Sequence, residues 1–257
     1  MKKTVCKVLA TAVALQAAMS LTPSFAAAAA NGVAEQSSDM QAINSAKKTG
    51  WKKEGNQWYY FKNDGTKQTG WVVLEDKEYY FNSDGTLKTG WVDDNGSYWR
   101  YVNSDRTLKT GWAQIDGKKY FFESSGYLAP GWVEEDGNTY FITKDEGALT
   151  GWQQFGDGKY YNHKHYFDSN GVLQTGWLTL AGKKYYFDSY GTMLTGWQEI
   201  GNKKYYFDSD GSMHIGFKVI DGKTYYFYYS DGSMAKGVMK AKGKTYTFDS
   251  NGVLQTN

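Results

Sequence analysis

Cysteine is nearly absent from the 257-residue chain, which contains only Cys6. A lysine-rich start, an apolar run over residues 8–19 and small residues on both sides of Phe25 predict a secretory signal peptide over residues 1–26. Cleavage after Ala26 would remove Cys6, so we expect an exported mature chain without a thiol. This excludes disulfides, thiol catalysis and metal sites built on cysteine.

A long apolar run and a block of one charge are also missing. After residue 26, no stretch approaches the roughly 20 apolar residues that a membrane helix requires. The predicted signal peptide carries three of the 29 Lys and Arg and none of the 27 Asp and Glu, so the mature net charge is about −1. We therefore expect no transmembrane segment and no nucleic-acid partner, because the basic surface of a nucleic-acid binder is absent.

Aromatic residues and glycine are abundant, and they recur together. A Gly-aromatic step returns every 20 or 21 residues, with one interval of 25 residues after Trp152. The aromatic residues of these steps are Trp51, Trp71, Trp91, Trp112, Trp132, Trp152, Trp177, Trp197 and Phe217, and Val238 holds the next equivalent place. Such a period indicates a solenoid or array over residues 50–257. Residues 27–49, rich in Ala, Ser and Gln, are predicted to be a flexible linker, which leaves no room for a separate catalytic domain.

Each repeat has the pattern of a β-hairpin. In one unit, residues 197–200 precede Gly201-Asn202, and residues 203–208 precede Asp210-Gly211. Turn-forming pairs recur at the first junction, because Gly with Asn or Asp reaches positive φ at low cost. These pairs are Asn95-Gly96, Asp116-Gly117, Asp136-Gly137 and Asp221-Gly222. We predict an all-β fold, a β-solenoid of about ten stacked hairpins of about 20 residues each.

Side chains alternate along the second strand, so Tyr205 and Phe207 share one face and Tyr206 takes the other. The first face is aromatic or apolar in every regular unit, whereas the middle position is read as accepting Arg100 and Thr247. A lone hairpin is marginal in water, so the constant face is predicted to be the core shared between neighbours. For the tryptophans two interpretations stay open: they seal the joints between hairpins, or they line grooves for a ligand.

The pattern of Gly-Trp, Gly, Tyr-Tyr-Phe and Asp-Gly over residues 50–257 resembles the cell-wall-binding repeats of bacterial surface proteins. This family includes choline-binding modules, glucan-binding repeats of glucosyltransferases and the C-terminal repeats of large clostridial toxins. The resemblance implies a β-solenoid. In its choline-binding branch a cage takes the Trp after Gly, a second Trp before the Tyr pair, and an aromatic from the next repeat. Trp58 matches the second Trp and Trp99 is read as displaced by one residue, so one cage is expected: Trp51, Trp58 and Trp71 or Tyr79.

Elsewhere the position of the second Trp is polar or charged. It is read as Glu78, Lys119, Thr139, Lys159, Lys184, Lys204, Thr224 and Thr245. A lysine there would repel a cation, so carbohydrate is ranked above choline, and an indole offers a flat face to a sugar ring. The candidate ligand-binding residues are Trp51, Trp58, Trp71, Trp91, Trp112, Trp132, Trp152, Trp177, Trp197, Tyr79, Tyr160, Tyr161 and Tyr166.

The long unit over residues 152–176 is either a deeper groove or an inert loop. Its insertion is expected to bring Tyr160, Tyr161 and Tyr166 towards Trp177. His163 and His165 are interpreted as exposed loop residues rather than metal ligands. The Asp-x-Asp-Gly segments are interpreted as turns, because the full calcium-loop pattern is absent. We expect no metal and no cofactor.

The sequence thus predicts a secreted, non-catalytic protein of the bacterial surface that binds cell-wall or surface carbohydrate polymers through repeated aromatic grooves. Several weak sites on one rigid rod would bind a polymer tightly through their effective concentration. Two alternatives stay open. One is a choline-binding module for choline-bearing wall polymers, and the other is a structural or adhesive spacer without a specific ligand.

Overall fold

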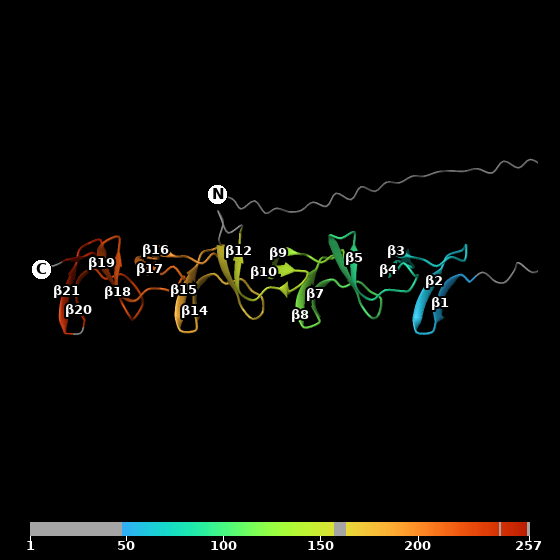
Figure 1. Cartoon of the computed structure of the whole chain (residues 1–257), viewed down its shortest axis with the longest axis horizontal. Helices are drawn as coiled ribbons and strands as arrows, with labels where there is room; N and C mark the ends of the chain where they lie inside the picture. The colour runs from blue at the N-terminus through green and yellow to red at the C-terminus, as the bar shows by residue number, and fades with distance from the viewer. Residues whose placement is uncertain (1–47, 157–162, 242, 256–257) are drawn as a thin grey trace, which may run out of the picture. The chain divides into compact units, whose positions relative to one another are not determined.

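The computed structural model describes residues 48–156, 163–241 and 243–255 (Figure 1). Within these ranges the chain forms strands and turns, and no helix is long and apolar enough to cross a membrane. The predicted signal peptide and most of the predicted linker lie outside the described residues. The all-β prediction is confirmed for the described part of the chain.

The described strands form ten small antiparallel sheets, each built on one hairpin. The first five hairpins are β1 (Gly50–Glu54) with β2 (Gln57–Phe61), β3 (Gly70–Leu74) with β4 (Lys77–Phe81), β5 (Gly90–Asp94) with β6 (Tyr98–Val102), β7 (Gly111–Ile115) with β8 (Lys118–Phe122), and β9 (Gly131–Glu135) with β10 (Asn138–Thr143). The others are β12 (Gly151–Phe155) with β13 (His163–Phe167), β14 (Gly176–Leu180) with β15 (Lys183–Phe187), β16 (Gly196–Ile200) with β17 (Lys203–Phe207), β18 (Gly216–Ile220) with β19 (Lys223–Phe227), and β20 (Gly237–Ala241) with β21 (Lys244–Phe248). The short strands β11 (Gly147–Ala148) and β22 (Leu254–Gln255) add to β10 and β21. Figure 1 shows the hairpins following one another in chain order.

The hairpin turns have the backbone that their sequence predicts. Asp116 and Gly117 have φ angles of 51° and 77°, and Asp221 and Gly222 have 50° and 74°. Positive φ at both central residues defines the type I′ turn, whose twist matches that of the two strands. In the hairpins that have them, the short Asp-Gly and Asn-Gly signals therefore set where the chain reverses.

The core lies on the face that the alternation predicted. In the β16–β17 hairpin, Tyr205 and Phe207 are buried, whereas Tyr206 pairs with Trp197 across the strands and is half-buried. One late hairpin departs from the rule, because in β19 Tyr226 is buried and Tyr225 is only half-buried. The face prediction is confirmed in the middle of the array and is wrong for β19.

Loops after the hairpins connect each hairpin to its neighbours. The backbone N–H of Met213, in the loop after β17, donates to the carbonyl of Lys184 in β15 at 2.7 Å. A Cβ added to Gly232, in the loop after β19, would overlap the side chain of Met213. Met213 thus contacts both the preceding hairpin and the following loop. Glycine is required at position 232 because that loop passes directly over the Met213 side chain.

Gly211 offers a direct test of this close approach. Its φ is +85°, and a Cβ there would lie 2.9 Å from Met193 Cγ, with the Met193 sulfur closer still. We expect Gly211→Ala to lower the free energy of unfolding by about 2 to 4 kcal/mol, from backbone strain and overpacking together. Gly201→Ala is the matched control, because Gly201 has a φ of +64° and no atom within 4 Å of the added Cβ. Urea unfolding should show a smaller loss there, and equal losses would refute the close approach.

Candidate functional site

The tryptophans after glycine lie at the joints between hairpins. Trp177 contacts Tyr186 of its own hairpin and Tyr205 of the next, each with ring centroids 5.0 Å apart. Phe207 of the next hairpin lies 5.8 Å away. The ring still keeps 43% of its surface exposed, and Trp132 keeps 50%. These tryptophans therefore seal the joints and also present an open face.

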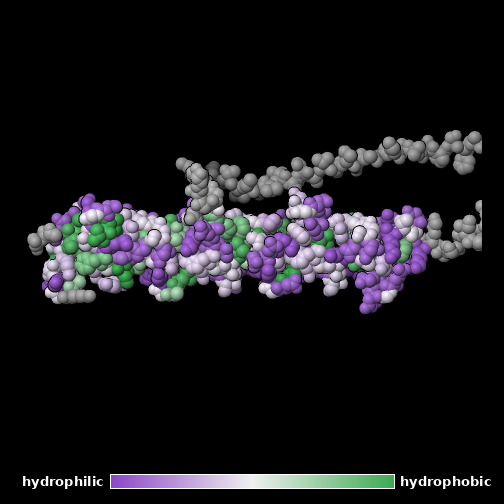
Figure 2. All heavy atoms as spheres, in the orientation of Figure 1, coloured by the Kyte–Doolittle hydropathy of each residue, from purple (hydrophilic) through white to green (hydrophobic). Residues whose placement is uncertain are grey.

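On the face shown in Figure 2, hydrophobic residues are exposed in separate spots rather than in one continuous band. This face therefore has no long groove of uniform chemistry. The grooves at successive joints differ in one residue of the second strand of each hairpin. This residue pairs with the fourth residue of the first strand, as Trp58 pairs with Lys53.

The first joint is an aromatic cage made by two indoles and a phenol. Trp51 and Trp58 meet edge to face with centroids 6.3 Å apart and an interplanar angle of 83°. Tyr79 of the next hairpin lies 4.9 Å from Trp51. The sequence predicted either Trp71 or Tyr79 as the third wall of this cage. Tyr79 forms it, because Trp71 packs with Tyr80 at its own joint.

A second cage of the same geometry lies two hairpins further on. Trp91 and Trp99 meet at 6.4 Å and 82°, and Tyr120 of the next hairpin lies 4.9 Å from Trp91. Trp99 pairs with Asp93 across the strands, as Trp58 pairs with Lys53. The prediction that Trp99 is displaced was therefore wrong: one extra residue, Ser97, lies in the turn and restores the register. Counting back from Val102, the buried last residue of the strand, would have given the correct register of Trp99.

The same register corrects the place of Arg100. It occupies the buried face rather than the middle position, which belongs to Tyr101 opposite Trp91. The Arg100 guanidinium lies 4.4 Å from the ring centroid of Trp71, and Nη1 donates to Glu78 at 3.0 Å. Asp94 and the Tyr127 hydroxyl are further partners. The groove at Trp71 is thus filled by a cation of the chain itself.

Each two-indole cage also faces a cation from a loop further along the chain. The Arg106 guanidinium carbon is 5.0 Å from the centroid of Trp58 and 5.9 Å from that of Trp51. The Lys144 ammonium is 3.9 Å from Trp91 and 4.6 Å from Trp99. The attraction of cations to indole faces explains both positions. The sequence reasoning missed both residues, because nothing local links them to tryptophans about 50 residues earlier.

Several other joints carry a lysine where the cages carry the second tryptophan. The ammonium of Lys119 lies 4.1 Å from Trp112, that of Lys204 4.5 Å from Trp197, and that of Lys164 4.8 Å from Trp152. Lys164 is the residue in register in the long unit, since it pairs with Gln154, so the assignment of Lys159 to this position was wrong. Lys119 and Lys204 lie at the register position that the sequence predicted, and repulsion of a second cation by such a lysine stays a prediction.

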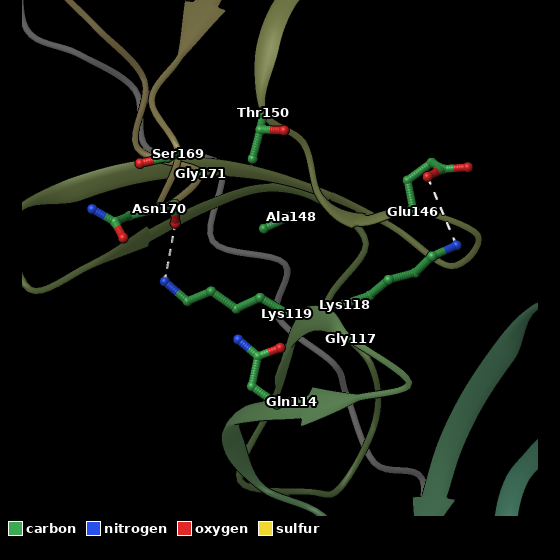
Figure 3. A pocket seen from close by; sticks show the side chains of 10 residues that line it. All are labelled: Gln114, Gly117, Lys118, Lys119, Glu146, Ala148, Thr150, Ser169, Asn170 and Gly171. Carbon is green, nitrogen blue, oxygen red and sulfur yellow. Dashed lines mark hydrogen bonds and ion pairs between the residues drawn. The ribbon is translucent and has the colours of Figure 1, made fainter.

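A cavity of about 380 Å³ lies beside Lys119 (Figure 3). Its lining comes from the β7–β8 hairpin and from the loops after β10 and β13. Lys119 donates to the backbone carbonyl of Asn170 at 3.2 Å, and Lys118 pairs with Glu146 at 3.7 Å. Gln114 and Thr150 add an amide and a hydroxyl to the wall. The cavity therefore offers hydrogen-bonding groups of the kind that sugar hydroxyls or anions use.

The histidines of the long unit lie on a strand. His163 and His165 belong to β13, and His165 is buried, with its ring 5.7 Å from Trp132 and 5.3 Å from Phe155. Burial lowers the pKa of His165, so the neutral ring packs in this joint. The prediction of loop residues was wrong for both histidines, because both lie on β13. The prediction of exposure was wrong for His165, whereas His163 is exposed.

Tyr166 of this unit packs on Trp152 of its own hairpin at 5.2 Å, rather than towards Trp177. Lys159, Tyr160 and Tyr161 lie outside the described residues. Among the residues that are described, no cluster of three or more His, Cys, Asp or Glu could hold a metal ion.

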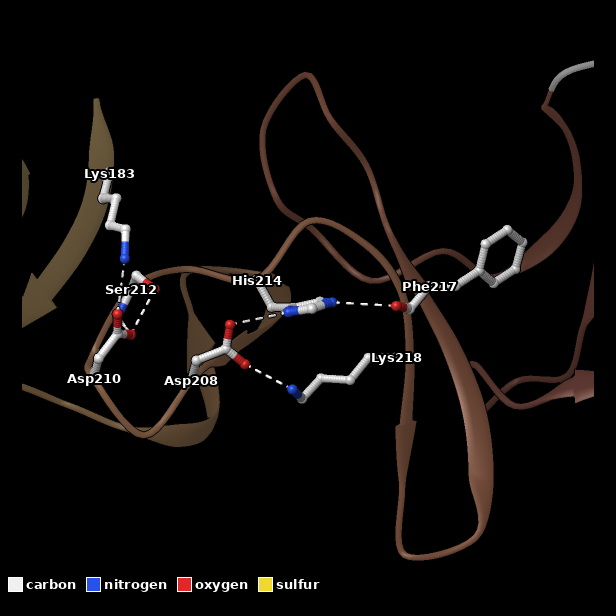
Figure 4. Close-up of polar contacts among 7 residues, drawn as sticks. All are labelled: Lys183, Asp208, Asp210, Ser212, His214, Phe217 and Lys218. Atoms are coloured by element: carbon white, nitrogen blue, oxygen red, sulfur yellow. Dashed lines mark hydrogen bonds and ion pairs between the residues drawn. The ribbon is translucent and has the colours of Figure 1, made fainter. Parts of the chain in front are cut away.

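Charged pairs near the C-terminal hairpins connect loops and strands (Figure 4). Asp208 accepts from Lys218 at 2.7 Å and lies 3.0 Å from His214 Nδ1. Burial acts to raise the pKa of Asp208, but its bonds to Lys218 and His214 outweigh burial and lower it. Asp210 accepts from the Ser212 hydroxyl and from Lys183, and both contacts hold its pKa well below the usual range. Every polar group drawn has a partner within the chain, so this cluster is structural.

Two models of repeat families match segments along the described chain. The family model "Choline-binding repeat" matches residues 48–77, 109–150 and 214–257, and a cell wall binding repeat model matches residues 69–87, 175–193 and 195–213. No curated protein matches the sequence.

Several solved structures from Streptococcus pneumoniae are similar. CbpJ has 27% identity and a TM-score of 0.61, with 81% of this chain and 88% of CbpJ covered. Choline binding protein F has 26% identity and a TM-score of 0.53, with 80% and 92% covered. The choline-binding domain of CbpL has 28% identity and a TM-score of 0.52, with 76% and 100% covered.

Proposed function

Because the chain belongs to the family of choline-binding and cell-wall-binding repeats, we propose that it is a non-catalytic module that binds the bacterial cell wall through its two-indole cages. The observation that carries this proposal is the pair of equivalent cages, Trp51 with Trp58 and Trp91 with Trp99, each closed by a tyrosine of the next hairpin. A quaternary ammonium over such rings gains about 1 to 2 kcal/mol by cation–π attraction.

The register of Trp99 changes the ranking of ligands. With one cage and many lysines, the sequence favoured carbohydrate over choline. With two complete cages, choline-bearing wall polymer becomes the first ligand, because two sites on one chain bind a polymer far better than one. A choline ammonium that enters a cage must displace Arg106 or Lys144, which lie over the same indole faces. The similarity to choline binding protein F, which was crystallised in the presence of a peptidoglycan analogue, supports a wall ligand.

Carbohydrate remains a second ligand, at a different place. The cavity beside Lys119 is walled by amide, hydroxyl and ammonium groups, and the indole of Trp112 lies next to that lysine. We assign sugar residues of the same wall polymer to this cavity, and choline to the cages. Trp132, Trp152, Trp177 and Trp197 then make weak contacts along the polymer, whereas Trp71 has no binding role because Arg100 fills its groove.

The β-solenoid is part of this proposal. Its support is the repeated connection in which a loop N–H donates to the preceding hairpin, as from Met193 to Lys164 and from Met234 to Lys204. The proposal also includes a signal peptide over residues 1–26, a linker over residues 27–49 and a location on the bacterial surface. A rigid array at the surface would hold both cages towards the wall.

Sedimentation with purified walls tests the function. Residues 27–257 should sediment with choline-bearing walls, and millimolar free choline should release part of the protein. Walls from which choline has been removed chemically are the control and should retain much less. Equal retention on both walls would assign binding to glycan alone. Release of reducing sugar by the pure protein would refute a non-catalytic role, and unchanged Trp fluorescence with no sedimentation would favour the spacer.

A further inference from the structure

Arg100 stands where most repeats carry a tyrosine. It is the third residue of β6, the place that Tyr79, Tyr120 and Tyr205 hold in β4, β8 and β17. Those tyrosines close a joint by contact with an indole of the preceding hairpin, as Tyr120 does with Trp91 at 4.9 Å. Arg100 adds ion pairs to such a contact, so it connects more parts of the chain than a tyrosine does.

The guanidinium of Arg100 connects three parts of the chain. It lies 4.4 Å from the ring centroid of Trp71 in β3, and Nη1 donates to Glu78 in β4 at 3.0 Å. Within its own hairpin, Nη2 lies 3.6 Å from Asp94 at the end of β5. The Tyr127 hydroxyl, in the loop after β8, accepts from Nη2 and donates to Asp94 at 3.0 Å. These contacts form one closed polar network around a single side chain.

The parts that Arg100 connects carry the walls of both cages. The β3–β4 hairpin carries Tyr79, the third wall of the first cage. The β5–β6 hairpin carries both indoles of the second cage, and Tyr127 lies in the loop that follows Tyr120, the third wall of that cage. The backbone of Tyr127 also forms an antiparallel bridge with that of Arg100. Arg100 therefore contacts both of the hairpins that separate the two cages.

The chemistry of a buried guanidinium makes this connection directional. Arg100 is buried, and its planar group donates in fixed directions. Charge-assisted hydrogen bonds are stronger than neutral ones, whereas aromatic rings stay in favourable contact over a range of distances and angles. A shift of one hairpin against the next would leave a buried cation without its partners, which is costly. The joint at Trp71 is thus held in one arrangement.

We propose that Arg100 is a positioning residue that holds the two cages in one fixed arrangement, so that a single polymer occupies both. The affinity for a polymer is the product of the two cage affinities and an effective concentration. A fixed arrangement raises the effective concentration, because less freedom is lost when the second cage binds. Arg100 therefore contributes to polymer binding and not to the binding of one free choline. This proposal rests on the proposed function.

The test compares one-site with two-site binding in Arg100→Met. Methionine is flexible and fills the groove at Trp71, but it forms no ion pair. The affinity for free choline, from a titration followed by Trp fluorescence, should stay within about twofold of the wild-type value. The affinity for choline-bearing walls should fall about fivefold, because the effective concentration is reduced. Arg100→Lys keeps the charge but loses the planar fork, so it should recover part of this loss.

A second measurement reports the arrangement of the cages without any ligand. Asn56 and Ser97 are exposed residues in the turns of the two cage hairpins, and each is replaced by a cysteine that carries a spin label. The predicted mature chain has no other cysteine. The distribution of distances between the two labels should be broader with Arg100→Met than with Arg100, because the hairpins between the cages are less tightly held.

Lys203→Met is the matched control, because it removes an ion pair between a hairpin and a later loop outside both cages. Lys203 of β17 pairs with Asp231 at 2.8 Å. It should leave both affinities and the distance distribution unchanged. An unchanged wall affinity or an unchanged distribution in Arg100→Met, or equal losses for walls and free choline, would overturn the proposal while the cages stood. A wild-type chain that binds no choline would overturn the proposed function as well.

Discussion

Replacing Trp58 and Trp99 together by alanine should lower the affinity for choline-bearing walls by about 100-fold, whereas each single replacement should lower it by about tenfold. One indole over a quaternary ammonium contributes about 1 to 2 kcal/mol, which is close to a factor of ten. The two cages are separate sites, so their two tenfold losses multiply to about 100-fold. Titration of walls into the protein, followed by sedimentation, measures the three affinities.

The controls for these variants come from the same array. Trp132→Ala removes a half-exposed indole whose joint lacks a second tryptophan, since Thr139 stands at that position. It should change the affinity by about threefold or less, as a single shallow contact does. A loss as large as that of the double variant would show that open indole faces, rather than cages, carry the binding. Unchanged circular dichroism would establish that all variants fold.

Much of the fold could be predicted because its signals are local. An Asp-Gly or Asn-Gly pair requires positive φ over two residues, and the alternation of Tyr205, Tyr206 and Phe207 assigns the faces over three. Each of these signals acts within one hairpin. The repeat then multiplies them, so the hairpins and most of their buried residues followed from the sequence.

The site was harder to predict because it depends on register and on stacking. One extra turn residue shifted the apparent place of Trp99, and the insertion before β13 hid that Lys164 rather than Lys159 faces Trp152. A slip of one residue moves every side chain to the other face of a strand, so such errors change the chemistry of a groove. Arg106 and Lys144 reach their cages only across the hairpin in between, which no pattern within a repeat encodes.

Replacing Phe187 by alanine in the middle of the array should lower the free energy of unfolding by about 3 to 5 kcal/mol. Phe187 is 1% exposed, and its ring lies 5.8 Å from Trp152 of the preceding hairpin. The shortened side chain would leave a cavity at a joint on which two hairpins depend, because each hairpin buries its core face only against neighbours. Urea unfolding of the purified chain measures the loss.

Tyr186→Ala is the matched control, one residue away on the same strand. Tyr186 is half-buried and packs on Trp177 at 5.0 Å, so its removal opens a surface to water rather than a closed cavity. We expect a loss of about 1 to 2 kcal/mol. Equal losses for the two variants would mean that both faces of β15 contribute alike to stability. The assignment of one face of β15 to the core and the other to the surface would then be wrong.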